Sequence, residues 1–272
     1  MYEFSYVKPA SLDEAAQLLA NHDDAKPLSG GMTLIPTLKQ RLAQPSHLID
    51  IAALTELRGI EVTAGQLIIG AATRHIEVAT SVTVRTALPA LAALASTIGD
   101  PQVRNRGTLG GSVANNDPNA DYPAAVLALG ATVHTQRRAI AADDFFQGVF
   151  TTAIEEGELI TRIAFPLPTR AAYAKFPHPA SGFAMTGVFV AETGGRVRVA
   201  VTGAGPGVFR WREAEAALAD RFAAESIEAL VVDPSGLNAD IHAPAEYRAN
   251  LMKVLASRAL RAILNSSEGA VA

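Results

Sequence analysis

The sequence contains no cysteine. Without thiols the chain has no disulfide, no thiolate-ligated iron–sulfur cluster, no cysteine nucleophile and no cysteinyl flavin bond. The sequence also lacks an excess of positive charge. It has 23 Lys and Arg residues against 27 Asp and Glu residues, which gives a net charge of −4 and a pI near 5.9. Because no global positive field attracts a polyanion, these numbers argue against nucleic acid as a partner.

Long apolar runs are also absent. Gly, Pro and charged residues interrupt every apolar stretch before it reaches the ~18 residues of a membrane span. The segment Met1–Tyr6 lacks the basic and apolar regions of a signal peptide. We therefore expect a soluble, cytoplasmic protein with no membrane span.

Hydrophobic residues make up 49% of the 272 positions, which is enough for a sizeable core. In residues 1–165, short β-like runs alternate with helical patterns, as in α/β units. The segment Pro166–Arg170 is the best domain boundary. Beyond it, the pattern predicts antiparallel strands and then helices near 212–220 and 247–264. We expect an α+β protein.

Three local predictions concern the middle of the chain. Ala64–Gly65 should form the turn of a hairpin between residues 59–62 and 66–70. Thr73 is expected to cap the next helix. Residues 100–122 are dense in Gly, Asn, Asp and Pro, which predicts a long loop; loops of that length inside a compact domain are usually functional.

A first glycine-centred segment, Ser29–Thr33, reads Ser-Gly-Gly-Met-Thr between a predicted strand and a predicted helix. Adjacent glycines let the backbone approach a ligand closely, and free amides beside a helix start suit a phosphate. Plain turn chemistry explains the same pattern. The segment lacks the Lys-Ser/Thr ending of a P-loop and the spacing of a Rossmann dinucleotide turn.

A second segment runs from Asp100 through Arg104 and Arg106 to Asp121. It offers hydroxyls and backbone amides for a second phosphate or for sugar oxygens, at Thr108, Gly110, Gly111 and Ser112. Asp121 is a candidate acceptor for sugar hydroxyls. The alternative is a structured surface loop whose arginines pair with Asp100 and Asp117.

Catalytic machinery of its own is not expected in this chain. Ser112 lies in no Gly-x-Ser-x-Gly elbow and has no histidine at a partner spacing. The six histidines are scattered without a short metal-ligand spacing, so no metal site is predicted.

At these two segments the sequence resembles the FAD-binding medium subunits of the carbon monoxide dehydrogenase and xanthine dehydrogenase family of molybdenum hydroxylases. The segment from Ser29 to Pro36 resembles the first FAD loop of that family, and the stretch from Ile98 to Pro123 resembles the second. Segments at 47–51, 69–73 and 175–177 match the family pattern in order and approximate spacing, so the resemblance covers nearly the whole chain.

The resemblance implies an FAD-binding domain at 1–168, made of two α/β subdomains at about 1–56 and 57–168. A C-terminal domain at 169–272 would combine an antiparallel sheet with packed helices. The residues that it implies for cofactor binding are Ser29, Gly30, Gly31, Met32, Thr33, Leu34, Thr108, Gly110, Gly111, Ser112, Asp121, Ile160 and Lys175. Related flavoproteins that attach flavin covalently use a histidine after the paired glycines; Met32 stands there, which implies non-covalent FAD.

The resemblance further implies an oxidoreductase subunit that takes electrons from an iron–sulfur subunit and passes them to an external acceptor. The molybdenum cofactor and 2Fe-2S clusters would lie on a large and a small partner subunit, in a heterotrimer that pairs into a dimer of heterotrimers. One alternative is a stand-alone flavin-dependent oxidoreductase. Another is a non-enzymatic ligand-binding or assembly protein that has lost FAD. The sequence names neither the substrate of the assembled enzyme nor its electron acceptor.

Overall fold

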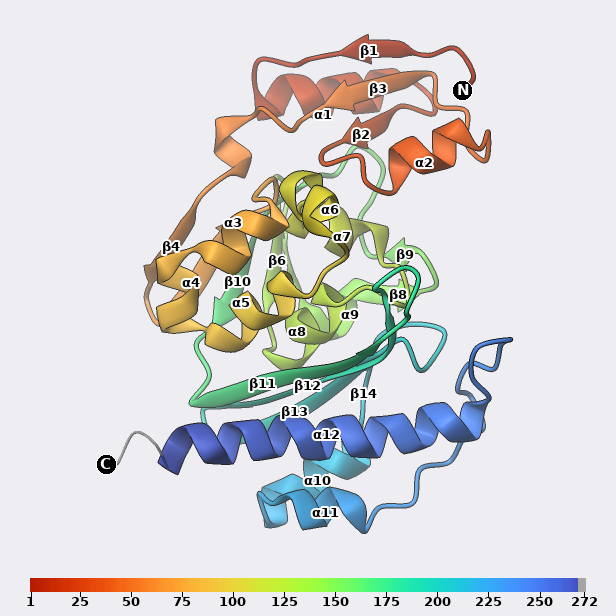
Figure 1. The fold of residues 1–272 in the computed structure, drawn as a ribbon. Helices are drawn as coiled ribbons and strands as arrows, with labels where there is room; N and C mark the ends of the chain where they lie inside the picture. Colours follow the sequence, from red (N-terminus) through yellow and green to blue (C-terminus); the bar gives the residue numbers. More distant parts are fainter. Residues whose placement is uncertain (269–272) are drawn as a thin grey trace.

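The computed structural model describes residues 1–268. The three larger β-sheets of the described residues follow one another along the chain and lie in successive layers, with helices packed between and below them (Figure 1). The α+β class predicted from the sequence is confirmed. Within residues 1–268, no helix has the length and hydropathy needed to cross a membrane.

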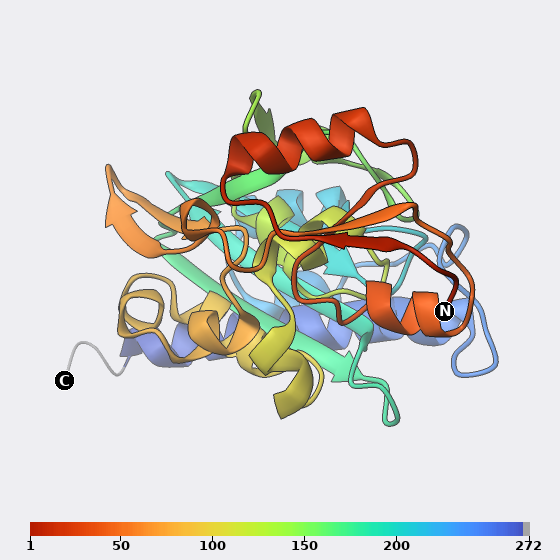
Figure 2. The same ribbon diagram turned by 90° about the horizontal axis from the view of Figure 1, so that it is seen from above.

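The first layer is a small parallel sheet. Its strands are β1 (Ser5–Val7), β2 (Lys26–Leu28) and β3 (His47–Asp50), in the order β1-β3-β2. Parallel neighbours need a crossover, and helices α1 (Leu12–Asn21) and α2 (Leu34–Lys39) occupy the two connections. Figure 2 shows this layer from above, lying over the rest of the chain.

The second layer is an antiparallel sheet in the order β4-β5-β10-β6-β7, entered through the short helix η1 (Thr55–Leu57). Its strands are β4 (Ile60–Thr63), β5 (Gln66–Gly70), β6 (Thr132–Thr135), β7 (Ala139–Ala141) and β10 (Ile160–Pro166). The turn predicted at Ala64–Gly65 is confirmed: both residues have positive φ, 48° and 74°, as a two-residue hairpin turn requires.

Helices cover this sheet and build the largest apolar core. They are α3 (His75–Thr80), α4 (Val82–Ala87), α5 (Pro89–Ser96), α7 (Leu109–Asn115), α8 (Tyr122–Ala128) and α9 (Ala142–Phe145). Helix α6 (Pro101–Arg106) packs against α3 and has no buried residue. Thr73 does not cap α3, contrary to expectation. The N-cap is Arg74, whose amide donates to the Glu77 side chain at 2.8 Å, while the Thr73 hydroxyl donates to the Gly59 carbonyl.

The loop predicted for residues 100–122 is also wrong in part, because α6 and α7 lie inside it. The Asp100 carboxylate accepts from the amide of Val103 at 2.8 Å and Pro101 occupies the first turn, so α6 has a good start. Thr108 caps α7 in the same way. Two glycines in the first turn of α7 concealed that helix in the sequence.

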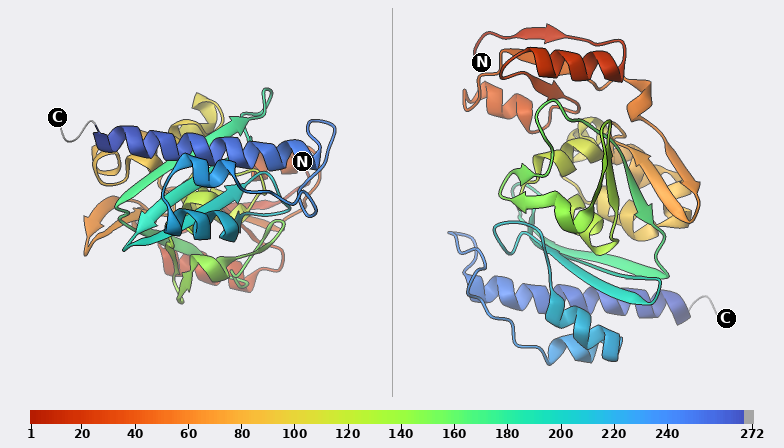
Figure 3. Two further views of the ribbon diagram at one scale, coloured as in Figure 1. Left: turned by 90° about the horizontal axis from the view of Figure 1, so that it is seen from below. Right: turned by 180° about the vertical axis from the view of Figure 1, so that it is seen from behind.

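The third layer is the antiparallel sheet β11 (Arg170–Pro177), β12 (Ala184–Thr193), β13 (Arg196–Thr202) and β14 (Phe209–Arg210), in that order. The long helix α12 (Ala245–Glu268) crosses one face of it beside α10 (Arg212–Asp220) and α11 (Ala224–Glu228), as Figures 1 and 3 show. Helices α5 and α8 lie on its other face. A small separate hairpin, β8 (Phe146–Gly148) and β9 (Thr151–Thr152), projects beside α7.

Candidate functional site

A cavity of about 760 Å³ is lined by residues of the first two layers and of the hairpin between β11 and β12. Its volume falls within the roughly 300–1,000 Å³ that is usual for cofactor sites. With the exception of Lys175, every cofactor-binding residue predicted from the sequence lines this cavity. Segments of the chain as distant as residues 29 and 160 therefore meet at one site.

The first glycine segment lines the cavity and carries a row of unused donors. Within the described chain, none of the backbone amides of residues 30–34 donates a hydrogen bond. Gly31 has φ 72°, a conformation that glycine adopts without strain. Consecutive free amides in a tight turn form a concave site for an anion. This part of the cavity therefore suits a phosphate group.

The second segment is joined directly to the first. The hydroxyls of Ser29 and Thr108 lie 2.9 Å apart in a hydrogen bond. A Cβ added to Gly30 would lie 2.2 Å from the carbonyl oxygen of Arg106, so only glycine allows the two segments to approach this closely. The two predicted loops thus form one continuous wall of the cavity.

The amides at the start of α7 are less available than the sequence suggested. Leu109 donates to the carbonyl of Thr73 at 3.0 Å, and Gly110 donates to that of Ala71 at 2.8 Å. Gly110 is required for packing instead, because an added Cβ would lie 2.5 Å from the Cβ of Ala71. Gly111 is the glycine of α7 that is exposed to the cavity.

The alternative in which the arginines pair with Asp100 and Asp117 is not observed. Arg104 donates instead to the carbonyls of Ile98 and Gly99, at 3.0 and 2.9 Å. Asp100 caps α6, and Asp117 accepts from the amide of Asn119 at 2.9 Å. The second segment is therefore held by its own helix caps and carbonyl contacts.

Asp121 lines the cavity from the start of α8 and is 3% exposed. Its Oδ1 accepts from the Tyr173 hydroxyl at 2.6 Å and from Lys175 Nζ at 3.0 Å. Burial raises the pKa of the Asp121 carboxyl, while Lys175 and Tyr173 act in the opposite direction. Lys175 also donates to the carbonyl of Thr97 at 2.9 Å. Lys175 thus stands behind Asp121 and fixes it, rather than lining the cavity.

His75, the first residue of α3, is a cavity-lining residue that sequence reasoning missed. Its ring packs against Tyr122 with centroids 5.4 Å apart, and its Nδ1 has no hydrogen-bond partner among the described residues. Burial, with a smaller effect from the Arg104 guanidinium, lowers the pKa of His75 to about 4. The cavity wall at this point is therefore neutral at pH 7.

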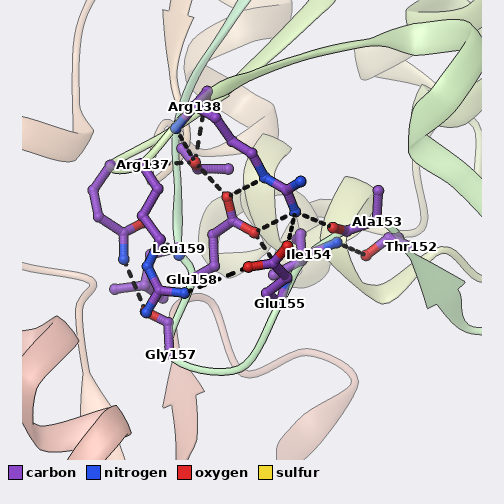
Figure 4. A network of polar contacts seen from close by, with 11 residues as sticks. Arg137, Arg138, Thr152, Ala153, Ile154, Glu155, Gly157, Glu158 and Leu159 are labelled. Atoms are coloured by element: carbon purple, nitrogen blue, oxygen red, sulfur yellow. Dashed lines mark hydrogen bonds and ion pairs between the residues drawn. The ribbon is translucent and has the colours of Figure 1, made fainter.

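The far wall of the cavity is held by a buried carboxylate, drawn in Figure 4. Glu158 accepts from Arg138 through both oxygens, each at 3.0 Å, and from the Thr135 hydroxyl at 2.7 Å. Arg138 also donates to the Ala153 carbonyl at 2.7 Å. These contacts fix residues 153–160, several of which line the cavity.

The network predicts an acid-sensitive stability. The hydrogen bonds from Arg138 are the main cause that lowers the pKa of Glu158 from 4.5 to about 2. Because the pKa of Glu158 is lower in the folded state, its ionised carboxylate contributes its full share to the free energy of unfolding above pH 4.5. That share disappears as the pH falls through 2. We expect Glu158→Gln to lower the free energy of unfolding at pH 7 by about 2 kcal/mol. Urea titrations should show the gap between variant and wild type closing from pH 5 to pH 2; a gap that stays constant contradicts the assignment.

Two exposed phenylalanines at the cavity were also missed. Phe150 belongs to the β8–β9 hairpin and Phe183 to the β11–β12 hairpin, and both line the cavity although they are 58% and 44% exposed. No local sequence pattern marks them, since each is a single aromatic residue near a turn. Their position depends on how two distant hairpins are placed.

Comparisons with known proteins agree with this geometry. Residues 2–168 match the family described as FAD binding domain in molybdopterin dehydrogenase. The carbon monoxide dehydrogenase medium chain of Hydrogenophaga pseudoflava is 36% identical, covering 95% of this chain and 96% of the relative. The nicotine 6-hydroxylase medium subunit of Paenarthrobacter nicotinovorans is 35% identical, covering 94% and 95%. The crystal structure of quinoline 2-oxidoreductase from Pseudomonas putida 86 superposes with a TM-score of 0.88 at 31% identity, covering 97% of this chain and 98% of that chain.

The fold and the two-loop cavity define an FAD-binding protein of the molybdopterin dehydrogenases, and the family match covers most of the chain. This chain belongs to the family of FAD-binding medium subunits of carbon monoxide dehydrogenase and xanthine dehydrogenase type. The resemblance seen in the sequence is thereby confirmed, and with it the oxidoreductase class.

The residues present fit the cofactor of that family. The unused amides of residues 30–34 provide donors for a pyrophosphate. Among the described residues, the Oδ2 of Asp121 accepts only from Lys175, at 3.2 Å, and so retains capacity for a hydroxyl. The neutral, apolar stretches of the lining suit flat aromatic rings.

Proposed function

We propose that this chain binds FAD without a covalent bond and transfers electrons from an iron–sulfur partner to an external acceptor. The observation that carries the proposal is the row of unused amides at residues 30–34, which line a cavity of suitable size in a chain of this family. When bound, FAD supplies the redox chemistry, which amino-acid side chains lack. The chain's own residues bind and orient it.

In this proposal the roles divide along the cavity. Residues 30–34 bind the pyrophosphate, with Ser29 and Thr108 holding the two loops together. Ser112 and Asp121 receive the sugar hydroxyls, and Ile160 borders the far end of the cavity. Lys175 is a positioning residue that orients Asp121. The residue after the paired glycines is Met32, whose side chain is not a nucleophile that could attach to flavin, and this agrees with non-covalent binding.

The wider assembly belongs to the same proposal. Because the chain has no cysteine, thiolate-ligated clusters must lie on another polypeptide. We infer a heterotrimer with a molybdenum-cofactor large subunit and an iron–sulfur small subunit, which pairs into a dimer of heterotrimers. Within the chain, residues 1–168 form the FAD-binding domain, with subdomains at about 1–56 and 57–168. Residues 169–272 form the C-terminal domain, of which 269–272 lie outside the described residues.

Affinity purification of the chain from its native cells tests the assembly. The proposal predicts that it copurifies with one chain containing molybdenum and another containing iron and sulfide, measured by metal analysis and visible spectra. A flavin-loaded chain that purifies alone and oxidises a substrate by itself would support the stand-alone oxidoreductase instead.

Gly111 gives a direct test of the cavity. Gly111 lines the cavity. A Cβ added there would have one close contact among the described residues, with the Thr108 hydroxyl at 2.8 Å. We expect Gly111→Leu to abolish FAD retention while the apoprotein still folds and melts cooperatively, at a somewhat lower temperature because the Thr108 hydroxyl that caps α7 must shift. Flavin absorbance after gel filtration and a thermal melt provide the two readings. Full flavin content in the leucine variant would remove Gly111 from the site.

A further inference from the structure

His75 is a buried side chain whose two ring nitrogens both lack a partner among the described residues. The residue is 4% exposed, and its Nδ1 is buried from solvent without a hydrogen bond. Its Nε2 makes no hydrogen bond to a described residue either, but Nε2 is not closed off from solvent in the same way. Because an unpaired polar group in a buried position destabilises a fold, such a nitrogen generally meets a ligand or an ordered water.

The Nε2 atom lies at the wall that the two glycine segments share. His75 lines the cavity together with Gly107 and Thr108. A Cβ added to Gly107 would lie 2.5 Å from Nε2, and a Cβ added to Gly30 would lie 2.7 Å from the Gly107 Cα. Gly107 is therefore in close contact with both Gly30 and the imidazole. The ring nitrogen thus lies beside the second segment at the place where that segment meets the first.

Backbone contacts and packing hold the imidazole in that position. The His75 amide donates to the carbonyl of Gly107 at 2.9 Å, and Arg74 forms an antiparallel bridge with Thr108. The ring also packs against Tyr122, with centroids 5.4 Å apart. Because the imidazole is already held beside Gly107, a ligand that contacts it loses little affinity to the ordering of this side chain.

We propose that His75 is a further FAD-binding residue, whose Nε2–H donates a hydrogen bond to an oxygen of the pyrophosphate. The inference rests on the proposed function, in which the amides of residues 30–34 bind that pyrophosphate. Burial lowers the pKa of His75 to about 4, so at pH 7 the imidazole is neutral and donates from one nitrogen. A phosphate oxygen beside Nε2 places the proton on Nε2 and leaves Nδ1 unprotonated. His75 therefore adds a donor to the site without adding a positive charge.

Titration of the apoprotein with FAD and, separately, with ADP tests this contact, because ADP has a pyrophosphate but no flavin. We expect His75→Leu, which keeps an apolar side chain but no nitrogen, to raise both Kd values about tenfold. His75→Gln places an amide donor near the position of Nε2, so both Kd values should return to within about threefold of the wild type. His134→Leu is the matched control, because His134 lies outside the cavity lining and its replacement should leave both Kd values unchanged.

Nitrogen NMR of the ¹⁵N-histidine-labelled chain gives a reading that a loss of packing does not imitate. The chain has six histidines, and the signal missing from His75→Leu identifies the ring of interest. We expect the ADP-bound chain to show His75 as the tautomer protonated at Nε2, with the signal of His134 unchanged by ADP. A bound state in which the proton lies on Nδ1 would overturn the assignment.

The affinities give three further results that would contradict the contact. In a leucine variant that still melts cooperatively, unchanged Kd values would remove His75 from the site. A glutamine variant as weak as the leucine variant would assign the effect to packing, and a loss for FAD without a loss for ADP would exclude the pyrophosphate. Wild-type binding of FAD with any of these results contradicts only the role of His75. Failure of both the wild-type chain and its copurified complex to bind FAD contradicts the proposed function and the role of His75 together.

Discussion

Replacing Lys175 with methionine should lower the free energy of unfolding by about 3–5 kcal/mol, because it leaves the Asp121 carboxylate buried without its cation. The two side chains are 7% and 3% exposed and 3.0 Å apart. Lys175 also connects β11 to the carbonyl of Thr97 at the end of α5. Urea denaturation at pH 7 measures the loss, and a change below about 1 kcal/mol would contradict a buried ion pair.

A matched double variant separates charge from packing. In Asp121→Asn/Lys175→Met both charges are removed, and the amide oxygen still accepts from Tyr173, so most of the stability should return. Acid provides a second reading on the single variant. A carboxyl with a raised pKa destabilises the fold most above that pKa, so the loss in Lys175→Met should shrink as the pH falls. A loss that is equal at pH 4 and pH 8 would assign the effect to packing.

Replacing Gly30 with valine should lower the affinity for FAD by about a hundredfold or more. The added Cβ would lie 2.2 Å from the Arg106 carbonyl oxygen and 2.7 Å from the Gly107 Cα; because both are backbone atoms, the clash is relieved only by a shift of the chain. The first glycine segment must then move away from the second, which breaks the hydrogen bond between the hydroxyls of Ser29 and Thr108. Two displaced hydrogen bonds to a charged phosphate, at about 1.5–3 kcal/mol each, account for this factor.

Gly207 provides the control for that variant. It has no positive φ, and an added Cβ meets nothing within 4 Å, so Gly207→Val should bind FAD like the wild type. Titration of the apoprotein with FAD, followed by the quenching of flavin fluorescence, gives both affinities. Equal affinities in the two valine variants would show that the contact between the loops is not needed for binding.

The sequence was sufficient for the features that local chemistry determines. The Ala64–Gly65 turn, the two strands that it joins and the two glycine segments follow from turn residues and hydrophobic periodicity. Helices α6 and α7 were hidden because they are short and contain proline, glycine and asparagine, residues that mark loops equally well. Their caps, Asp100 and Thr108, were the available signal.

The features that the sequence did not predict depend on tertiary placement. Lys175 was expected at the cofactor, but β11 carries it behind Asp121, 54 positions earlier in the chain. The commitment of the Gly110 amide to Ala71 depends on how α7 packs against the end of β5. Phe150 and Phe183 line the same cavity from hairpins of different sheets. Such contacts between distant segments have no local pattern.

The visible absorption spectrum tests the central claim most directly. The purified chain, and separately its copurified complex, is mixed with FAD, freed of excess by gel filtration and then treated with acid. We predict an oxidised-flavin spectrum that survives filtration, with all the chromophore released into the acid supernatant. Flavin that stays with the precipitated protein would contradict non-covalent binding. The absence of flavin from both chain and complex would contradict the account as a whole.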